Sequence, residues 1–234
     1  TVTAGSLTGT TTFTPTDDSL YDATSNETAT VSIDSVSGGD ALENGTQSVT
    51  ITITDNESAP TVTLSRSAAA IDENSSSTVT ITATLSNTTY QDVTVSIGAS
   101  GATEGTDYAT ISDITISAGS TTGTTSLDPT DDSVYEDDET VTVTIDGVSG
   151  GSASESGSQS VSITITENES APTVSLSVSA TSITENAGSS LTLTATLSGA
   201  TDETVTVGID TGGTSTEGTA VSYTHLTLPT TGIV

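Results

Sequence analysis

The residues of this chain with the clearest capacity for chemistry are carboxylates gathered in a few turn-like segments. Between residues 60 and 171 they lie in AIDENSS, EGTDY, TDDSVYEDDET and ENE: Glu73, Asp107, Asp131, Asp132, Glu136, Asp137, Asp138, Glu139, Glu167 and Glu169. Two carboxylates about 4 Å apart repel each other by roughly 4 kcal/mol at an effective dielectric near 20. Arg66 is the only Lys or Arg in the chain, against 31 Asp and Glu. A divalent cation is therefore the available counter-charge.

The ligand types favour calcium. Carboxylates, Asn amides and backbone carbonyls are hard oxygen donors, and flexible loops with many such ligands suit Ca²⁺ better than Zn²⁺ or octahedral Mg²⁺. The linear EF-hand loop and the glycine-rich nonapeptides of calcium β-rolls are both absent, so a site must be assembled from separate loops. The alternative is a solvated acidic surface that keeps Thr-rich strands from aggregating. The spacing of the acids leaves both open.

We expect no enzyme. Nucleophile–base pairs usually need His, Cys or Lys, and the one histidine, His225, lies in an atypical tail. Paired carboxylates can hydrolyse glycosides, but the chain has no Trp and a single Phe, Phe13. We interpret Tyr108 and Tyr135 as packing residues rather than a sugar platform.

The elements that carry these loops are predicted to be β-strands. Val, Ile and Leu alternate with Thr and Ser in the segments 49–53, 79–85, 93–97, 141–145, 161–165 and 191–197. Alternation with period two, separated by Gly, Ser, Asp and Asn, is typical of antiparallel strands with one buried and one wet face. We predict an all-β fold of tandem, immunoglobulin-like antiparallel β-sandwich repeats of about 112 residues.

The repeat is visible in the sequence. TITDNESAPTVTLS (52–65) returns as TITENESAPTVSLS (164–177), an offset of 112, and AGSLTGTTTFTPTDDSLY (4–21) returns as AGSTTGTTSLDPTDDSVY (118–135), an offset of 114. We expect residues 60–171 to be a complete repeat. Residues 1–59 would be the C-terminal half of another, and residues 172–219 the N-terminal half of a third. Because half a sandwich exposes its inner face, we expect the halves to be less ordered, or to pair across chains.

The tail and the composition set further expectations. Residues 220–234 lose every match to the repeat and resemble translated adapter sequence, so we predict that they are not native; a genuine divergent end is the alternative. The net charge of −30 argues against binding nucleic acid or anionic membranes by charge. Cysteine is absent, and no apolar run is long enough to span a bilayer.

The central segments EGTDYATIS, AGSTTGTTSLDPTDDSVYEDDETVTVTI and SVSITITENE resemble the Calx-beta repeat of sodium/calcium exchangers and bacterial surface proteins. The resemblance covers residues 60–171, with AGS at Ala118 in place of the usual P-G turn. Carried onto this sequence, it implies a calcium shell. Asp132 and Glu136 would be central ligands, Glu139 would close the shell and Asp131 would be peripheral, while Glu73, Asp107, Glu167 and Glu169 would enter from other loops.

These observations predict a calcium-binding extracellular or cell-surface repeat module of an adhesin-like or stalk protein, stiffened by Ca²⁺ at repeat junctions. A calcium-sensing regulatory module and a metal-free acidic spacer are the alternatives. The expected partners are calcium ions and neighbouring repeats of the same chain, with other surface proteins or glycans as further candidates. We expect neither nucleic acid binding nor direct membrane insertion.

Overall fold

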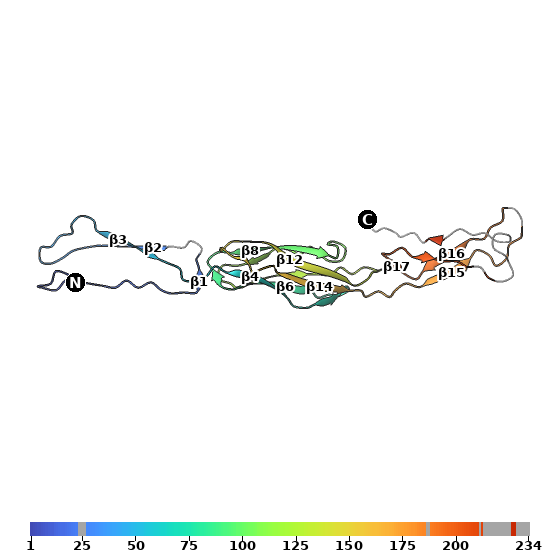
Figure 1. The fold of residues 1–234 in the computed structure, drawn as a ribbon, viewed down its shortest axis with the longest axis horizontal. Coiled ribbons are helices and arrows are strands. Elements are labelled where there is room, and N and C mark those ends of the chain that lie inside the picture. Colours follow the sequence, from blue (N-terminus) through green and yellow to red (C-terminus); the bar gives the residue numbers. More distant parts are fainter. Residues whose placement is uncertain (23–26, 186–187, 211, 213–225, 228–234) are drawn as a thin grey trace.

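The computed structural model describes residues 1–22, 27–185, 188–210, 212 and 226–227, and these form strands and loops without a helix. None of them belongs to a helix that could cross a membrane. The molecule is elongated, with residues 60–171 (the central unit) between a segment at each end (Figure 1). The prediction that residues 220–234 are not native, and the position of His225, lie outside the described residues except for Leu226 and Thr227.

The central unit is built from two sheets. One contains, in spatial order, β10 (Thr122–Leu127), β6 (Val79–Leu85), β4 (Thr61–Arg66) and β13 (Ser154–Glu155). The other contains β5 (Ala70–Asp72), β14 (Ser160–Thr166), β12 (Glu139–Ser149), β8 (Val93–Gly101) and β9 (Ile114–Ile116). Most neighbouring strands are antiparallel, while β13 on β4 and β5 on β14 are parallel. The architecture is consistent with a β-sandwich.

The alternating residues explain the core. In β6 every second side chain is buried, from Val79 to Leu85, and the intervening threonines are half-exposed. β12 and β14 contribute Val141, Val143 and Ile163 from the other sheet, so the apolar faces of the two sheets form one cluster. Tyr108 is buried in the same cluster, which confirms its interpretation as a packing residue.

The predicted strands are confirmed, with changes at their ends. The segment 79–85 is β6, while 93–97 extends to Gly101 as β8. The segment 141–145 extends in both directions as β12, which continues through a bulge between Ile145 and Gly147. Near its end, Gly150 has φ +91°, and a Cβ there would lie 2.1 Å from the Asp92 carbonyl oxygen, so only glycine fits this turn.

The two end segments form smaller sheets. In residues 1–59, β2 (Glu27–Ser32) pairs with β3 (Ser48–Ile53); after residue 171, β15 (Val174–Val178) pairs with β16 (Leu193–Leu197), and β18 (Thr206–Val207) with β19 (Leu226–Thr227). The strand predicted over 191–197 therefore begins two residues later.

Short parallel bridges join the end segments to the central unit. At one junction β1 (Leu20–Tyr21) pairs with β7 (Thr88–Thr89), and at the other β11 (Val134–Tyr135) pairs with β17 (Ala200–Thr201). In the repeat alignment β1 corresponds to β11 at the offset of 114, and β7 corresponds to β17 at the offset of 112. The two junctions are therefore built in the same way.

Candidate metal centre

Two groups of three carboxylates lie at one end of the central unit. Carboxylate oxygens of Glu73, Glu167 and Glu169 all lie within 4.8 Å of one another, and so do those of Asp107, Glu136 and Glu139. We name these the Glu73 triad and the Glu139 triad. One small pocket is lined by members of both triads, together with Asp137 and Ile165.

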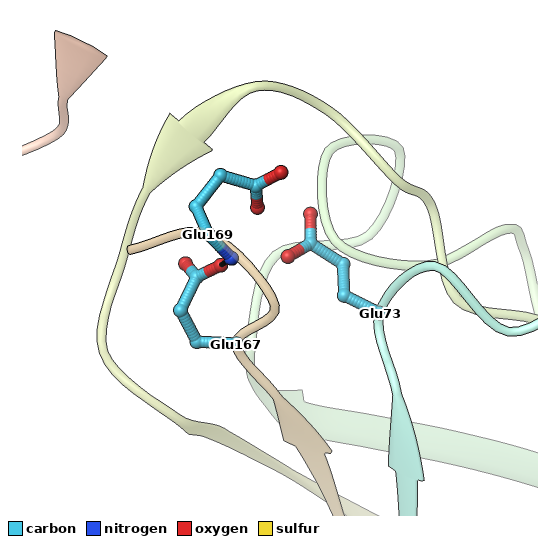
Figure 2. Close-up of side chains that lie close together, drawn as sticks. All are labelled: Glu73, Glu167 and Glu169. Carbon is cyan, nitrogen blue, oxygen red and sulfur yellow. Dashed lines mark hydrogen bonds between the residues drawn. The ribbon is translucent and has the colours of Figure 1, made fainter. Parts of the chain in front are cut away.

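Figure 2 shows how the Glu73 triad is assembled. Glu73 follows β5, whereas Glu167 and Glu169 follow the end of β14, and the segment that carries β11 arches over them. Because β5 and β14 are parallel neighbours, their C-terminal ends lie at the same edge of the sheet. The Glu169 backbone N–H donates to Glu167 Oε1 at 2.6 Å.

Backbone hydrogen bonds hold this triad in place. The Asp132 N–H donates to Glu73 Oε1 at 3.2 Å, and the Glu136 N–H donates to Glu167 Oε2 at 2.5 Å. The segment that contains Asp132 and Glu136 is thus held by hydrogen bonds to carboxylates from two other segments. Asp138 also takes part, since its Oδ1 accepts the Glu167 N–H at 3.0 Å.

The electrostatics of the Glu73 triad favour the addition of positive charge. Burial is the main cause that raises the pKa of Glu73, and the charge of Glu167 adds to it. A side-chain hydrogen bond with Glu167 and burial raise the pKa of Glu169 to about 7. Burial opposes the ionisation of Glu167 as well, but the backbone N–H groups of Glu169 and Glu136 outweigh it and lower the pKa of Glu167.

The Glu139 triad is perturbed in the same direction. Burial, followed by a side-chain hydrogen bond and the charge of Asp107, raises the pKa of Glu139 to about 7. Burial and the charges of Asp107 and Asp132 raise the pKa of Glu136. These carboxylates oppose one another's ionisation.

The donor set fits a hard divalent cation. Glu169 Oε2 is buried and has no hydrogen-bond partner within the described part of the chain, and a carboxylate oxygen of Glu169 lies within 4.8 Å of those of Glu73 and Glu167. Arg66, the only Lys or Arg, donates from Nη1 to the Ala69 carbonyl at 3.4 Å and is therefore engaged elsewhere. All-oxygen ligands on loops suit Ca²⁺.

Two of the predicted ligands lie outside both triads. Asp132 Oδ1 accepts the Val134 N–H at 2.6 Å, so this carboxylate closes its own turn. The hydrogen bond to Glu73 comes from the Asp132 backbone N–H, although the Asp132 charge adds to the raised pKa of Glu73. Asp131 is exposed, although its charge contributes to the raised pKa of Glu169. The remaining six predicted residues form the triads.

The structure also adds a residue that the sequence did not indicate. Asp202, just after β17, donates its backbone N–H to the Tyr135 carbonyl at 3.3 Å. Its charge raises the pKa of both Glu136 and Glu139. The Glu139 triad therefore lies near a carboxylate from the next segment. The repeat did not indicate an acidic residue at this position, because Asp202 aligns with Tyr90 at the offset of 112.

The other junction carries a related pocket of about 240 Å³. Six of its acidic lining residues align, through the repeat, with predicted ligands of the central unit. They are Asp17, Asp18, Asp22, Glu27, Asp55 and Glu57. Here the central unit contributes Tyr90, whose hydroxyl donates to Asp18 Oδ2 at 3.0 Å. A neutral donor thus occupies the position that Asp202 takes at the second junction.

Comparison with known families gives one result. Residues 58–168, a little under half of the chain, match the LapA domain family. No curated protein matches the chain. The LapA match points to a surface adhesin-related module with a surface or extracellular location.

The expected Calx-beta relationship is wrong, because the family that the central unit matches is a different one. The motifs that suggested it, a DY loop and a DD-x-x-aromatic-E-x-x-E segment, are short and acidic. Motifs this short do not by themselves separate one family from another. The ligand roles inferred from that resemblance are therefore no longer supported by it. They depend on the geometry of the two triads alone.

Proposed function

We propose that the chain is a calcium-binding structural module of a surface adhesin-related protein, built from tandem immunoglobulin-like β-sandwich repeats. Its partners are calcium ions and the neighbouring repeats. The LapA match supports the adhesin part and the extracellular or cell-surface location. The observation that carries the calcium part is the pair of carboxylate triads around one pocket, with Glu169 Oε2 buried and unpartnered among the described residues.

The location of the triads suggests what calcium would do. They lie at the end of the central unit that faces β17, and the charge of Asp202 reaches the Glu139 triad. An ion there would neutralise carboxylates on both sides of the junction. It would therefore favour a fixed angle between consecutive units.

Calcium binding is tested by thermal unfolding of the whole chain with increasing Ca²⁺. Ligand binding to the native state alone raises stability, by about 2.7 kcal/mol at a hundred times Kd. We expect Tm to rise with Ca²⁺ and to rise much less with Mg²⁺. An unchanged Tm, or an equal response to both ions, contradicts the proposal.

Variants locate the site. Glu73→Gln and Glu139→Gln each remove one triad carboxylate with little change of shape and should weaken the calcium response about tenfold or more in apparent Kd, since ligand charge tunes affinity. Asp128→Asn is the matched control, because Asp128 is exposed and belongs to neither triad. A calcium response that survives both Glu variants places the ion elsewhere.

A metal-free acidic spacer is the second candidate function. The observation in its favour is that Glu73 and Glu167 already accept backbone N–H groups from the acidic loop and from Glu169. In this case the carboxylates hold the loops in place by hydrogen bonds to backbone N–H groups, without an ion. Glu73→Gln would then lower Tm equally in calcium and in chelator.

A further inference from the structure

A turn between β2 and β3 recurs in the central unit with the same hydrogen bonds. Residues 43–47 read ENGTQ and residues 155–159 read ESGSQ, at the offset of 112. The Gln47 N–H donates to the glutamate Oε1 of its turn at 2.7 Å, and the Gln159 N–H does so in the other turn at 2.5 Å. Each glutamine also donates from Nε2 to the carbonyl of the second turn residue, at 2.7 Å and 2.6 Å. The conformation of this turn is therefore a property of the repeat.

One difference between the two turns bears on covalent chemistry. The second residue is Asn44 in the first turn and Ser156 in the other, and Asn44 is the only asparagine of the chain that a glycine follows. Asn44 and Gly45 are both exposed, and the Asn44 side-chain amide makes no hydrogen bond within the described part of the chain. Gly157, the counterpart of Gly45, is exposed as well. The exposure is therefore a feature of the turn, because the central unit shows it too.

An exposed Asn-Gly pair can modify itself. The backbone nitrogen of the glycine attacks Cγ of the asparagine, and the new N–Cγ bond closes a succinimide ring. The Cγ–Nδ2 bond breaks, and Nδ2 leaves as ammonia with the proton of the glycine N–H. Water then opens the ring at one of its two carbonyls, which gives either aspartate or isoaspartate. Water is the only co-reactant, and no group is oxidised or reduced.

Gly45 makes this attack accessible. Because glycine has no Cβ, its nitrogen approaches the preceding side chain with little steric hindrance, and the space around Gly45 is open. The Gly45 N–H donates to the Glu43 carbonyl at 3.1 Å. This bond belongs to a three-residue turn, and it is the one bond of the attacking nitrogen that must open.

The other asparagines that the structure describes are less suited to the reaction. Asn56 and Asn74 precede a glutamate and a serine, whose Cβ hinders the approach of the backbone nitrogen. Asn87 and Asn168 use the amide itself, since Nδ2 donates to the Ser58 carbonyl at 2.9 Å in one case and to the neighbouring Glu Oε1 at 3.2 Å in the other. The combination of a free amide and a following glycine occurs at Asn44 alone among them.

We propose that Asn44 is a self-modification site, at which the Asn44–Gly45 pair closes to a succinimide and hydrolyses to isoaspartate and aspartate as the folded protein ages. Isoaspartate places an additional methylene in the main chain. The two hydrogen bonds from Gln47 close around the modified residue. The longer backbone therefore breaks the turn, whereas the aspartate product only adds a charge.

The central unit shows what this turn contributes to a complete repeat. The Ser156 N–H donates to the Val62 carbonyl at 2.9 Å, and Gln159 Oε1 accepts the Leu64 N–H at 3.3 Å. The turn leads into β14 and is thereby bonded to β4 of the other sheet. Isoaspartate at the second position of the turn therefore weakens the connection between the two sheets.

Mass spectrometry of peptides from the whole chain, incubated at neutral pH, tests the site. The peptide that contains Asn44 should gain the mass difference between an amide and a carboxyl group and separate into two isomers, of which isoaspartyl methyltransferase labels one. Peptides that contain Asn56 or Asn74 should stay unmodified over the same period. An Asn44 peptide that does not change, or that changes no faster than the Asn74 peptide, overturns the proposal.

Exchange of the second turn residue between the repeats tests the role of the turn. Asn44→Ser should leave its peptide unmodified, and Ser156→Asn should introduce the same modification into the central unit. Freshly prepared, the Ser156→Asn chain should unfold at the Tm of the unaltered chain. After incubation its Tm should fall in proportion to the isoaspartate formed. An incubated Ser156→Asn chain that stays unmodified contradicts the proposal.

Ser156→Asp is the matched control for charge, because it adds the carboxylate of the product while the main chain keeps its length. Its Tm should fall less than that of the fully modified Ser156→Asn chain. Equal losses of Tm would assign the effect to the added charge and contradict the inferred loss of the turn. The near-ultraviolet signal of the buried Tyr108 monitors the central unit in every variant.

Discussion

At the scale of residues, the acidic end of the central unit combines carboxylates that resist ionisation with one that is held ionised. Burial raises the pKa of Glu139 to about 7, while backbone N–H groups of Glu169 and Glu136 lower that of Glu167. The fold thus brings negative charge together and retains it with backbone dipoles rather than with basic side chains. Such a site gains most from a cation.

The raised pKa values predict how stability depends on pH. Glu139 ionises with a pKa near 4.5 in the unfolded chain and about 7 in the folded chain, so between these values the folded state holds more protons. The free energy of unfolding in chelator should therefore fall as pH rises from about 4.5 to about 7. Glu167 acts in the opposite sense, and its contribution is lost as pH falls through its lowered pKa.

Urea unfolding across this pH range measures the effect. Glu139→Gln should make the decline shallower without abolishing it, because Glu139 is removed while Glu169, whose pKa is also raised to about 7, remains. In excess Ca²⁺ the decline should become shallower or reverse, since the ion competes with protons for the same oxygens. A decline that persists unchanged in Glu139→Gln would assign the pH dependence to other groups.

At the scale of elements, strands of similar sequence contribute different amounts to the stability of the chain. Val143 in β12 packs between two sheets, whereas Val31 in β2 occupies the aligned position in a sheet with one layer. Burial of apolar area, rather than intrinsic strand propensity, determines how much a strand contributes.

A pair of substitutions measures this difference within one chain. Val143→Ala leaves a cavity in the core and should lower the free energy of unfolding by about 2 kcal/mol. Val31→Ala, in dilute solution, should change it by less than about 0.5 kcal/mol. Denaturant unfolding followed by the Tyr108 signal provides the values. Equal costs would mean that Val31 is covered in the isolated chain.

At the scale of the whole molecule, the two junctions have the same construction but different chemistry. Both use a two-residue parallel bridge next to an acidic pocket. Tyr90 closes the first with a hydrogen bond to Asp18, and Asp202 adds negative charge at the second. We therefore expect the second junction to depend more strongly on a cation.

Small-angle scattering of dilute monomer with and without Ca²⁺ tests this stiffening. Calcium should lengthen the maximum dimension and reduce flexibility, and Asp202→Asn should weaken the response without affecting the Glu73 triad. Glu203→Gln is the control, since it removes a neighbouring exposed charge. A chain equally extended and equally flexible in chelator contradicts a structural role for calcium and leaves the regulatory alternative.

The sequence by itself determined the strands, the repeat offset and most of the acidic residues that meet. Period-two alternation predicts strands because it reflects the pleat itself, and β6 begins and ends where the pattern does. Glu73 and Glu167 were grouped only through the Calx-beta resemblance, and it is the geometry of the fold that brings them together. Short acidic motifs did not identify the family correctly, because the match of residues 58–168 is to a different family.

Only the tertiary structure decided how the acids divide. Asp132 turns its carboxylate to its own loop, Asp202 approaches from another segment, and Glu169 Oε2 is buried without a partner in the described chain. Each depends on contacts between residues far apart in sequence, which no local pattern encodes. Likewise, Val31 and Val143 are the same residue in the same motif, and only the presence of a second layer buries one and leaves the other exposed.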